Sequence, residues 1–165
     1  MQINDIYTGD HIGRGDHKAP AAVSAALIAG AGTRTPDASF VAYKDDGGKT
    51  TWAVTWLVGA QLVHVEATKS KTAWTSISDH RNSLDADVVG WVRPVRSLIE
   101  IGIAGQRISH AGVGDHVNVY PKWQLRFAGD AQSWAVFDHL SDSDLDEARE
   151  FVSKVREVWF DEKLQ

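Results

Sequence analysis

The chain contains no cysteine among its 165 residues. This absence excludes disulfide bonds, cysteine nucleophiles and sulfur-ligated zinc, and it is typical of proteins kept in a reducing compartment. The chain also has no apolar run near the roughly 20 residues that span a bilayer, and its polar, acidic residues 1–10 do not resemble a signal peptide. We therefore expect a cytoplasmic protein without membrane-spanning segments.

Positive charge is scarce as well, because 17 basic residues are set against 22 acidic ones and the formal net charge is -5. The basic residues form no long run, so the overall field does not favour phosphate-rich partners. We therefore expect no binding to nucleic acid. The preference for Ala, Val, Asp and Arg over Lys is typical of a high-GC bacterial or phage genome.

Motifs for catalysis are also missing. No serine lies in a Gly-x-Ser-x-Gly elbow, which excludes the usual hydroxyl nucleophile of the α/β-hydrolases. The sequence Gly30-Ala31-Gly32 follows a helical pattern instead of a strand, so it does not form a dinucleotide-binding loop. We therefore expect no enzymatic activity and no cofactor.

The apolar content of 43% suits one compact domain, and from Phe40 onward the apolar residues mostly alternate with a period of two. Such alternation, as in Thr51–Leu57, predicts half-buried strands, and the turn residues at 46–49 and 59–60 predict hairpins. Pro94 predicts a bend or an edge strand. About seven antiparallel strands are expected, at residues 39–44, 50–58, 61–68, 74–77, 88–103 (interrupted at Pro94), 117–128 and 132–137.

Two helices flank this strand-rich region. Near the C-terminus, an apolar stripe at three- and four-residue spacing predicts a long amphipathic helix with Ser141 or Ser143 as its cap. The stripe consists of Leu145, Ala148, Phe151, Val152, Val155, Val158 and Trp159. Near the N-terminus, a short helix over residues 17–29 is expected, capped by Asp16 and ended by Gly30. The sequence thus predicts an α+β, mainly β, fold with an N-terminal extension (1–38) and a barrel with a C-terminal helix (39–165), in a single compact domain.

A bent antiparallel barrel closed by a C-terminal helix with an inward tryptophan resembles the pleckstrin-homology-like superfold. The segments that carry the resemblance are 51–57, 89–95, 123–127 and the helix with Trp159. Lipid-binding members of that superfold place clustered Lys and Arg around the first hairpin, whereas this chain has Asp45, Asp46, Gly47 and Gly48 there. The resemblance therefore implies a barrel but does not imply phosphoinositide binding at a membrane.

Two other interpretations stay open. A helix-grip fold, with an early helix, antiparallel strands and a long C-terminal helix around an apolar cavity, would make the protein a small-molecule or lipid carrier. A metal-dependent hydrolase would use some of the five Asp-His pairs, with His110, Asp115 and His116 on one glycine-rich loop as the strongest ligand set. Adjacent strand residues point to opposite faces, so we do not expect these pairs to bind metal.

The seven tryptophans are expected to fill the core, with Trp74 and Trp91 as the exceptions. If exposed, each of these two could anchor a partner, because aromatic residues dominate binding hot spots. Basic residues near them, namely Lys69, Lys71, Arg81, Arg93 and Arg96, could steer an acidic partner. The sequence therefore favours a non-enzymatic protein-interaction module that binds a protein partner or a second copy of itself.

Overall fold

The computed structural model describes residues 12–14, 16–78, 86–110, 117–131, 134–135 and 142–164. The chain divides into two compact units, Met1–Pro94 and Val95–Gln165. Over these residues, the mainly β fold with two α-helices and antiparallel sheets confirms the predicted class. The predicted boundary near residue 38 does not coincide with the division at Pro94, because the N-terminal helix packs on the sheet that follows it.

The first unit is a four-stranded antiparallel sheet in the order β3-β4-β5-β6. Its strands are β3 (Ala38–Asp45), β4 (Thr50–Val58), β5 (Gln61–Lys69) and β6 (Asp87–Pro94). The β4 bounds equal those predicted, because the alternating tryptophans and valines are bracketed by turn residues. Gly59, with φ 56, occupies the tight turn between β4 and β5, where a left-handed backbone favours glycine.

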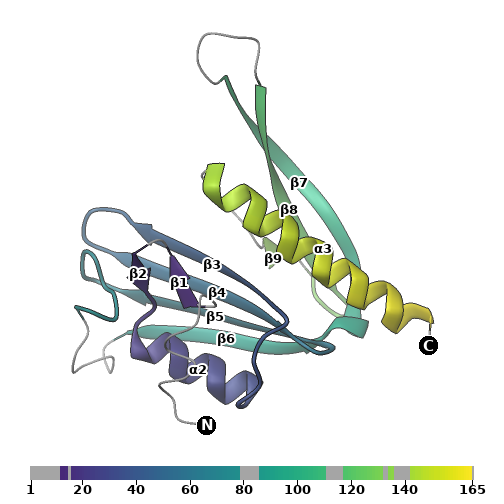
Figure 1. The fold of residues 1–165 in the computed structure, drawn as a ribbon, viewed down its shortest axis with the longest axis horizontal. Helices are drawn as coiled ribbons and strands as arrows, with labels where there is room; N and C mark the ends of the chain where they lie inside the picture. Colours follow the sequence, from purple (N-terminus) through teal and green to yellow (C-terminus); the bar gives the residue numbers. More distant parts are fainter. Residues whose placement is uncertain are drawn as a thin grey trace. The chain divides into compact units, whose positions relative to one another are not determined.

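Helix α2 (Ala21–Ala31) lies across one face of this sheet and contacts β4, β5 and β6 (Figure 1). Its approach is close at Gly30, where an added Cβ would lie 2.8 Å from a Val63 methyl and 3.0 Å from a Val92 methyl. The helix continues past Gly30, so the predicted helix end at Gly30 is wrong. The helix ends at Ala31, and Gly32 (φ 70) is its C-cap residue, whose N–H donates to the Ile28 carbonyl.

The start of α2 also differs from the prediction. His17 and Lys18 form the short strand β2 (His17–Lys18), which pairs with β1 (Gly13–Arg14), so the helix begins later than residue 17. Pro20 is the N-cap residue and makes no side-chain capping bond, so Asp16 is not the cap. The core between α2 and the sheet consists of Ile12, Ala19, Val23, Leu27, Val41, Trp52, Val54, Trp56, Val58, Val63, Val65, Ala67 and Trp74.

The segment at Trp74–Ile77 was predicted to be a strand and is instead a turn. Thr75 and Ser78 close this turn through the Ser78 hydroxyl, which accepts from the Thr75 amide at 2.7 Å and donates to the Ala73 carbonyl at 2.9 Å. The turn places Trp74 in the core, where its carbonyl accepts a 2.7 Å hydrogen bond from the Trp52 indole. A local hydroxyl network thus replaces the predicted ladder.

The second unit begins with the 3-10 turn η2 (Val95–Ser97) and contains a long hairpin of β7 (Leu98–His110) and β8 (Val117–Phe127). The short strand β9 (Trp134–Ala135) pairs with β8. Two register shifts interrupt the β7–β8 ladder, one between Leu98 and Glu100 and one between Ile103 and Gly105. Arg126 and Glu100 form an ion pair across this ladder at 2.6 Å.

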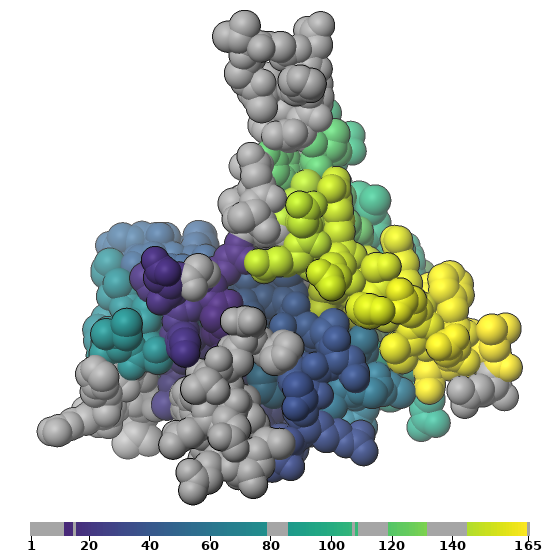
Figure 2. Space-filling model, in the orientation of Figure 1, coloured from purple at the N-terminus to yellow at the C-terminus, as the bar shows by residue number. Residues whose placement is uncertain are grey.

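Helix α3 (Asp142–Leu164) is the long C-terminal helix, shown in yellow at the surface in Figure 2. The predicted apolar stripe is confirmed from Leu145 to Val155, whose members are buried, while Val158 and Trp159 are half-buried. The Trp159 indole donates a 2.8 Å hydrogen bond to the Leu98 carbonyl and so ties the helix to the start of β7. The predicted cap Ser141 lies outside the described residues.

The described strands form three separate sheets of two, four and three strands. No closed barrel is found among them. In the part of the chain that the structure describes, no helix is both long enough and apolar enough to cross a membrane.

Candidate functional site

Strand β6 forms one edge of the four-stranded sheet, and it is apolar and exposed. Val88, Val89 and Val92 keep 39%, 64% and 44% of their surface exposed. Edge strands of natural proteins are usually protected by charged side chains or proline, because their open backbone groups can pair with another chain. On β6 the charged residues Asp87 and Arg93 lie near the ends of the strand and leave its middle uncharged.

The side chains of His64, Trp91 and Arg93 stack on one another near the end of β6. Trp91 lies opposite His64 of β5 in the strand register, and their rings stack at 5.3 Å with 29° between the planes. The Arg93 guanidinium carbon lies 5.3 Å from the Trp91 ring centroid. A cation over an indole contributes about 0.5–1 kcal/mol at exposed sites. The two contacts hold the half-buried indole in a defined position beside the open edge.

His64 belongs to a row of side chains that crosses the sheet. The register places Phe40, Thr55, His64 and Trp91 opposite one another on four successive strands. The His64 Nδ1 atom lies 3.0 Å from the Thr55 hydroxyl. Burial lowers the pKa of His64 to about 3, so the imidazole is neutral at physiological pH.

The hydroxyl and imidazole of this row lie at the distance used by nucleophile–base pairs. Only 2% of Thr55 and 5% of His64 are exposed, so a substrate cannot reach the hydroxyl. We interpret the pair as a satisfied polar contact inside the sheet. The imidazole of the pair stacks on the Trp91 ring and so helps to position it.

The predicted anchor Trp74 is fully buried, so it cannot contact a partner and belongs to the core. Its indole nitrogen has no hydrogen-bond partner among the described residues, and the Lys69 ammonium lies 5.8 Å from its ring. Lys71 donates to the Ser78 carbonyl at 3.0 Å. These two lysines therefore surround and close the turn that buries Trp74. Arg81 lies outside the described residues.

The predicted pair Arg93 and Arg96 is divided between the two units. Arg93 stacks on Trp91 at the end of β6, whereas Arg96 is exposed on η2, in the unit that begins at Val95. Trp91 and Arg93 are thus the two predicted site residues that the structure brings together. The signal that could have found the site is the uncharged run between Asp87 and Arg93.

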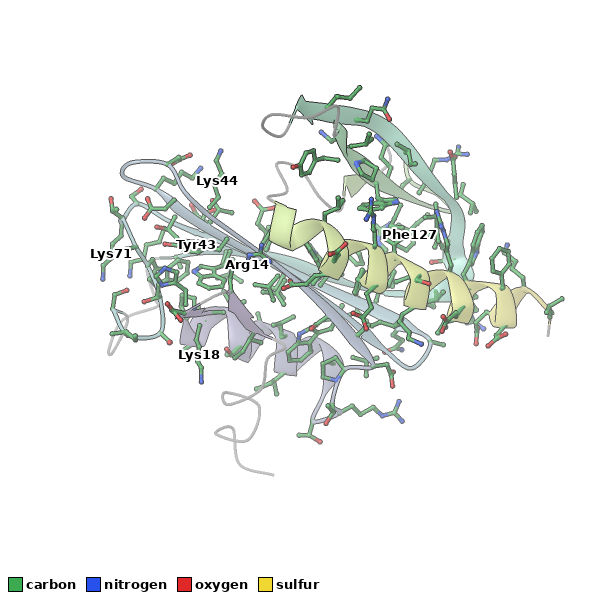
Figure 3. All side chains as sticks on the ribbon, turned by 45° about the horizontal axis from the view of Figure 1, so that its top comes forward. Arg14, Lys18, Tyr43, Lys44, Lys71 and Phe127 are labelled. Carbon is green, nitrogen blue, oxygen red and sulfur yellow. The ribbon has the colours of Figure 1, made fainter. Side chains whose placement is uncertain are left out.

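Sequence reasoning missed a second cluster, at the opposite edge of the sheet. The Tyr43 ring lies between the rings of His17 (5.1 Å) and Trp52 (4.7 Å). Burial, the charge of Asp45 and a hydrogen bond to it raise the pKa of the Tyr43 hydroxyl. Figure 3 shows Arg14 beside Tyr43, with Lys44 and Lys71 at the turn end of the sheet.

The Asp45 carboxylate organises that turn end. One of its oxygens accepts from the Ala73 amide at 2.6 Å and the other from the Gly47 amide at 3.3 Å. It therefore connects the β3–β4 turn to the segment after β5. We interpret the cluster as a structural clasp, because Asp45 accepts hydrogen bonds from Tyr43, Gly47 and Ala73.

The proposed ligand set His110, Asp115 and His116 falls where the structure describes no side chains. In the ranges that it does describe, no three His, Asp or Glu side chains are grouped closely enough to hold a metal ion. Of the five Asp-His pairs, the described one is Asp16-His17, and both residues are exposed. The chain matches no known protein-family profile, no curated protein and no solved structure.

Proposed function

We propose that this chain is a non-enzymatic protein-interaction module that binds an extended segment of a partner protein along β6. The observation that carries the proposal is the exposed, uncharged middle of an edge strand, at Val88, Val89 and Val92. Such an edge accepts a strand from another chain through main-chain hydrogen bonds. Side chains at alternate positions then supply specificity.

The turn between β4 and β5 indicates which β6 backbone groups are open. A two-residue loop, here Gly59-Ala60, is flanked by a hydrogen-bonded pair, which is Val58 with Gln61. Hydrogen-bonded and non-hydrogen-bonded pairs alternate along an antiparallel ladder. The even-numbered residues of β5 therefore direct their backbone groups toward β6.

Applied to β6, this alternation directs the backbone of Val89, Trp91 and Arg93 toward β5, since they lie opposite even-numbered β5 residues. The backbone groups of Val88, Gly90 and Val92 point away from the sheet. Pro94 belongs to the same outward set, where its missing N–H costs no ladder bond. The position of the proline on the strand thus agrees with an open outer edge.

The side chains of β6 suit a partner strand with alternating apolar residues. Trp91 and Val89 lie on one face of the sheet, and Val88 and Val92 lie on the face that α2 covers. Arg93 at the end of the strand favours an acidic residue opposite it. The partner segment that fits is extended, apolar in its middle and acidic at one end.

Selection of peptides from a random library displayed on phage tests this proposal. The full chain should enrich extended apolar peptides with an acidic residue at one end. Val89→Lys should abolish their binding, because a charged side chain protects an edge strand. Ile77→Lys is the matched control, since Ile77 is a similarly exposed apolar residue in the turn after Trp74. Enrichment that survives Val89→Lys would contradict the proposal.

The finer structural expectation, a pleckstrin-homology-like barrel, stays a prediction. Barrel closure requires a ladder that joins the four-stranded and three-stranded sheets, and the described strands contain none. The long C-terminal helix α3 and its Trp159 support the resemblance.

The absence of cysteine supports the predicted cytoplasmic location.

A further inference from the structure

We propose that the partner segment is β6 of a second copy of this chain, paired antiparallel with Gly90 on the two-fold axis. This inference rests on the proposed function, because it uses the same open edge. The strand Asp87–Pro94 is self-complementary in this register. Asp87 lies opposite Arg93 of the partner subunit, and Val89 lies opposite Trp91 of the partner subunit.

The register preserves the faces of the sheet. Paired positions sum to 180, so odd residues meet odd residues and even residues meet even residues. Val88 and Val92 therefore stay on the α2 face in both copies, and Asp87 and Arg93 stay on the other face. Each copy's Asp87 is placed against an opposite charge on the same face, so both ends of the strand pair are complementary.

The backbone groups fit the same register. The residues whose backbone points outward are Val88, Gly90 and Val92, and these are the residues that must exchange hydrogen bonds. Gly90 pairs with the Gly90 of the partner subunit, and Val88 pairs with the Val92 of the partner subunit. The two sheets thereby form one continuous sheet across the two-fold axis, which removes the open edge from both copies.

Helix α2 gives independent support. Its sequence, AAVSAALIAGA, contains no charged residue, and a helix that is apolar all round is typical of a buried one. Yet Ala21, Ala25 and Ala29 are exposed, on a helix that contacts β5 and β6 (Figure 1). A two-fold axis perpendicular to the sheet places both α2 helices on the same side. Their uncharged surfaces then flank the joined edge.

The interface is small. Stable complexes bury about 1,200–2,000 Å² in total, and one strand pair with flanking helices lies at the low end of that range. We therefore expect a dimer whose population depends on concentration. The matching charges at Asp87 and Arg93 are expected to set the register more than the affinity.

Sedimentation velocity of the full chain over a range of concentrations tests the inference. The unmodified protein should be a monomer–dimer equilibrium. Asp87→Arg and Arg93→Asp should each weaken dimerisation by about tenfold or more, since each places like charges opposite one another at both ends. An equimolar mixture of the two variants should restore it, because every pair then has opposite charges. Asp161→Arg, on exposed α3, carries the same charge change and should have no effect.

A cysteine trap provides a second measurement that detects weak dimers. Because the chain has no cysteine, Val88→Cys combined with Val92→Cys places thiols only at the two hydrogen-bonded pairs that join position 88 of each copy to position 92 of the other. Oxidation should give a covalent dimer, since directly opposed strand residues lie within disulfide range. Either substitution alone should give no covalent dimer. In the paired strands, position 88 of one copy lies four residues along the strand from position 88 of the other copy, and the same holds for position 92.

A chain that stays monomeric and forms no disulfide would overturn self-association. Dimers that ignore both charge variants and the cysteine pair would overturn this register. These outcomes are distinct from failure of the proposed function. If the monomeric chain binds peptides and Val89→Lys abolishes that binding, the proposed interaction module is supported and its partner is a different protein. Absence of both dimers and peptide binding would remove both proposals.

Discussion

The two edges of the four-stranded sheet differ in what protects them. At the β3 edge, strand β1 lies alongside, and the Arg14 guanidinium donates to the Val41 carbonyl at 3.5 Å. Phe40 and Val41 are buried there. At the β6 edge, Val88, Val89 and Val92 are exposed, and charges occur only toward the ends. One sheet thus has one edge protected by its own chain and one beside which no described segment lies.

The comparison shows that an edge is identified by what lies beside it, not by its own sequence. Both strands are apolar in the middle and have charged residues at an end. The N-terminal residues protect β3, and no described segment takes that place beside β6. The row of Phe40, Thr55, His64 and Trp91 crosses the sheet from one edge to the other. The effect of a substitution at one edge can therefore be compared with the effect of a substitution at the other edge.

The largest expected effect tests the assignment of inward and outward backbone groups on β6. Val89→Pro should remove an N–H that faces β5 and lower the free energy of unfolding by roughly 3 kcal/mol. Val88→Pro should change stability much less, because its N–H faces away from the sheet. Urea denaturation of both variants gives the comparison. Equal losses would refute the alternation along β6.

Gly90→Ala comes next. An added Cβ would lie 2.6 Å from the His64 carbonyl oxygen, so β6 must shift away from β5. Overpacking of this kind costs about 1–3 kcal/mol. Gly105→Ala is the matched control, since a Cβ there meets nothing within 4 Å. Thermal unfolding should separate the two variants, and equal melting temperatures would contradict the close β5–β6 approach.

The buried row should make stability depend on pH. The pKa of His64 is about 3 in the folded protein, below its value of about 6.5 in an unfolded chain, so the unfolded chain binds the proton more readily between these values. Stability should be full above pH 6.5. It should fall by up to about 1.4 kcal/mol per unit as the pH drops toward 3.

Urea denaturation at several pH values measures that slope. His64→Gln should flatten it, and His17→Gln, at an exposed site, should leave it in place. An unchanged slope in His64→Gln would show that other groups cause the acid dependence.

The smallest effect concerns the protected edge. Arg14→Ala removes a long hydrogen bond from a half-buried side chain, so we expect a loss below about 1 kcal/mol. Amide exchange in β3 should become faster while that of β6 stays the same. An increase in dimerisation of this variant would show that Arg14 blocks strand addition at β3.

The sequence predicted the parts of the fold that local patterns determine. Alternation and turn residues placed β4 correctly, and three- and four-residue spacing placed α3. Trp74 was misjudged because its place in the core depends on the Thr75–Ser78 turn and on Trp52, a contact 22 residues away. Alternation cannot reveal such a contact.

The candidate site was predicted in part. Trp91 and Arg93 were named as a candidate aromatic anchor and a basic residue that could steer a partner, yet the stacking of Trp91 on His64 and of Arg93 on Trp91 requires the β5–β6 register. The sequence also could not predict that β6 is an edge strand. Pro94 indicated either a bend or an edge strand, and only the strand order decides between the two.

The central claim is that the outer side of β6 is open to another strand. Residue-resolved hydrogen exchange at low and high protein concentration tests it most directly. At low concentration the amides of Val88, Gly90 and Val92 should exchange fast while those of Val89, Trp91 and Arg93 are protected, and at high concentration the first three should become protected. Slow exchange of all six amides in dilute protein would contradict the claim.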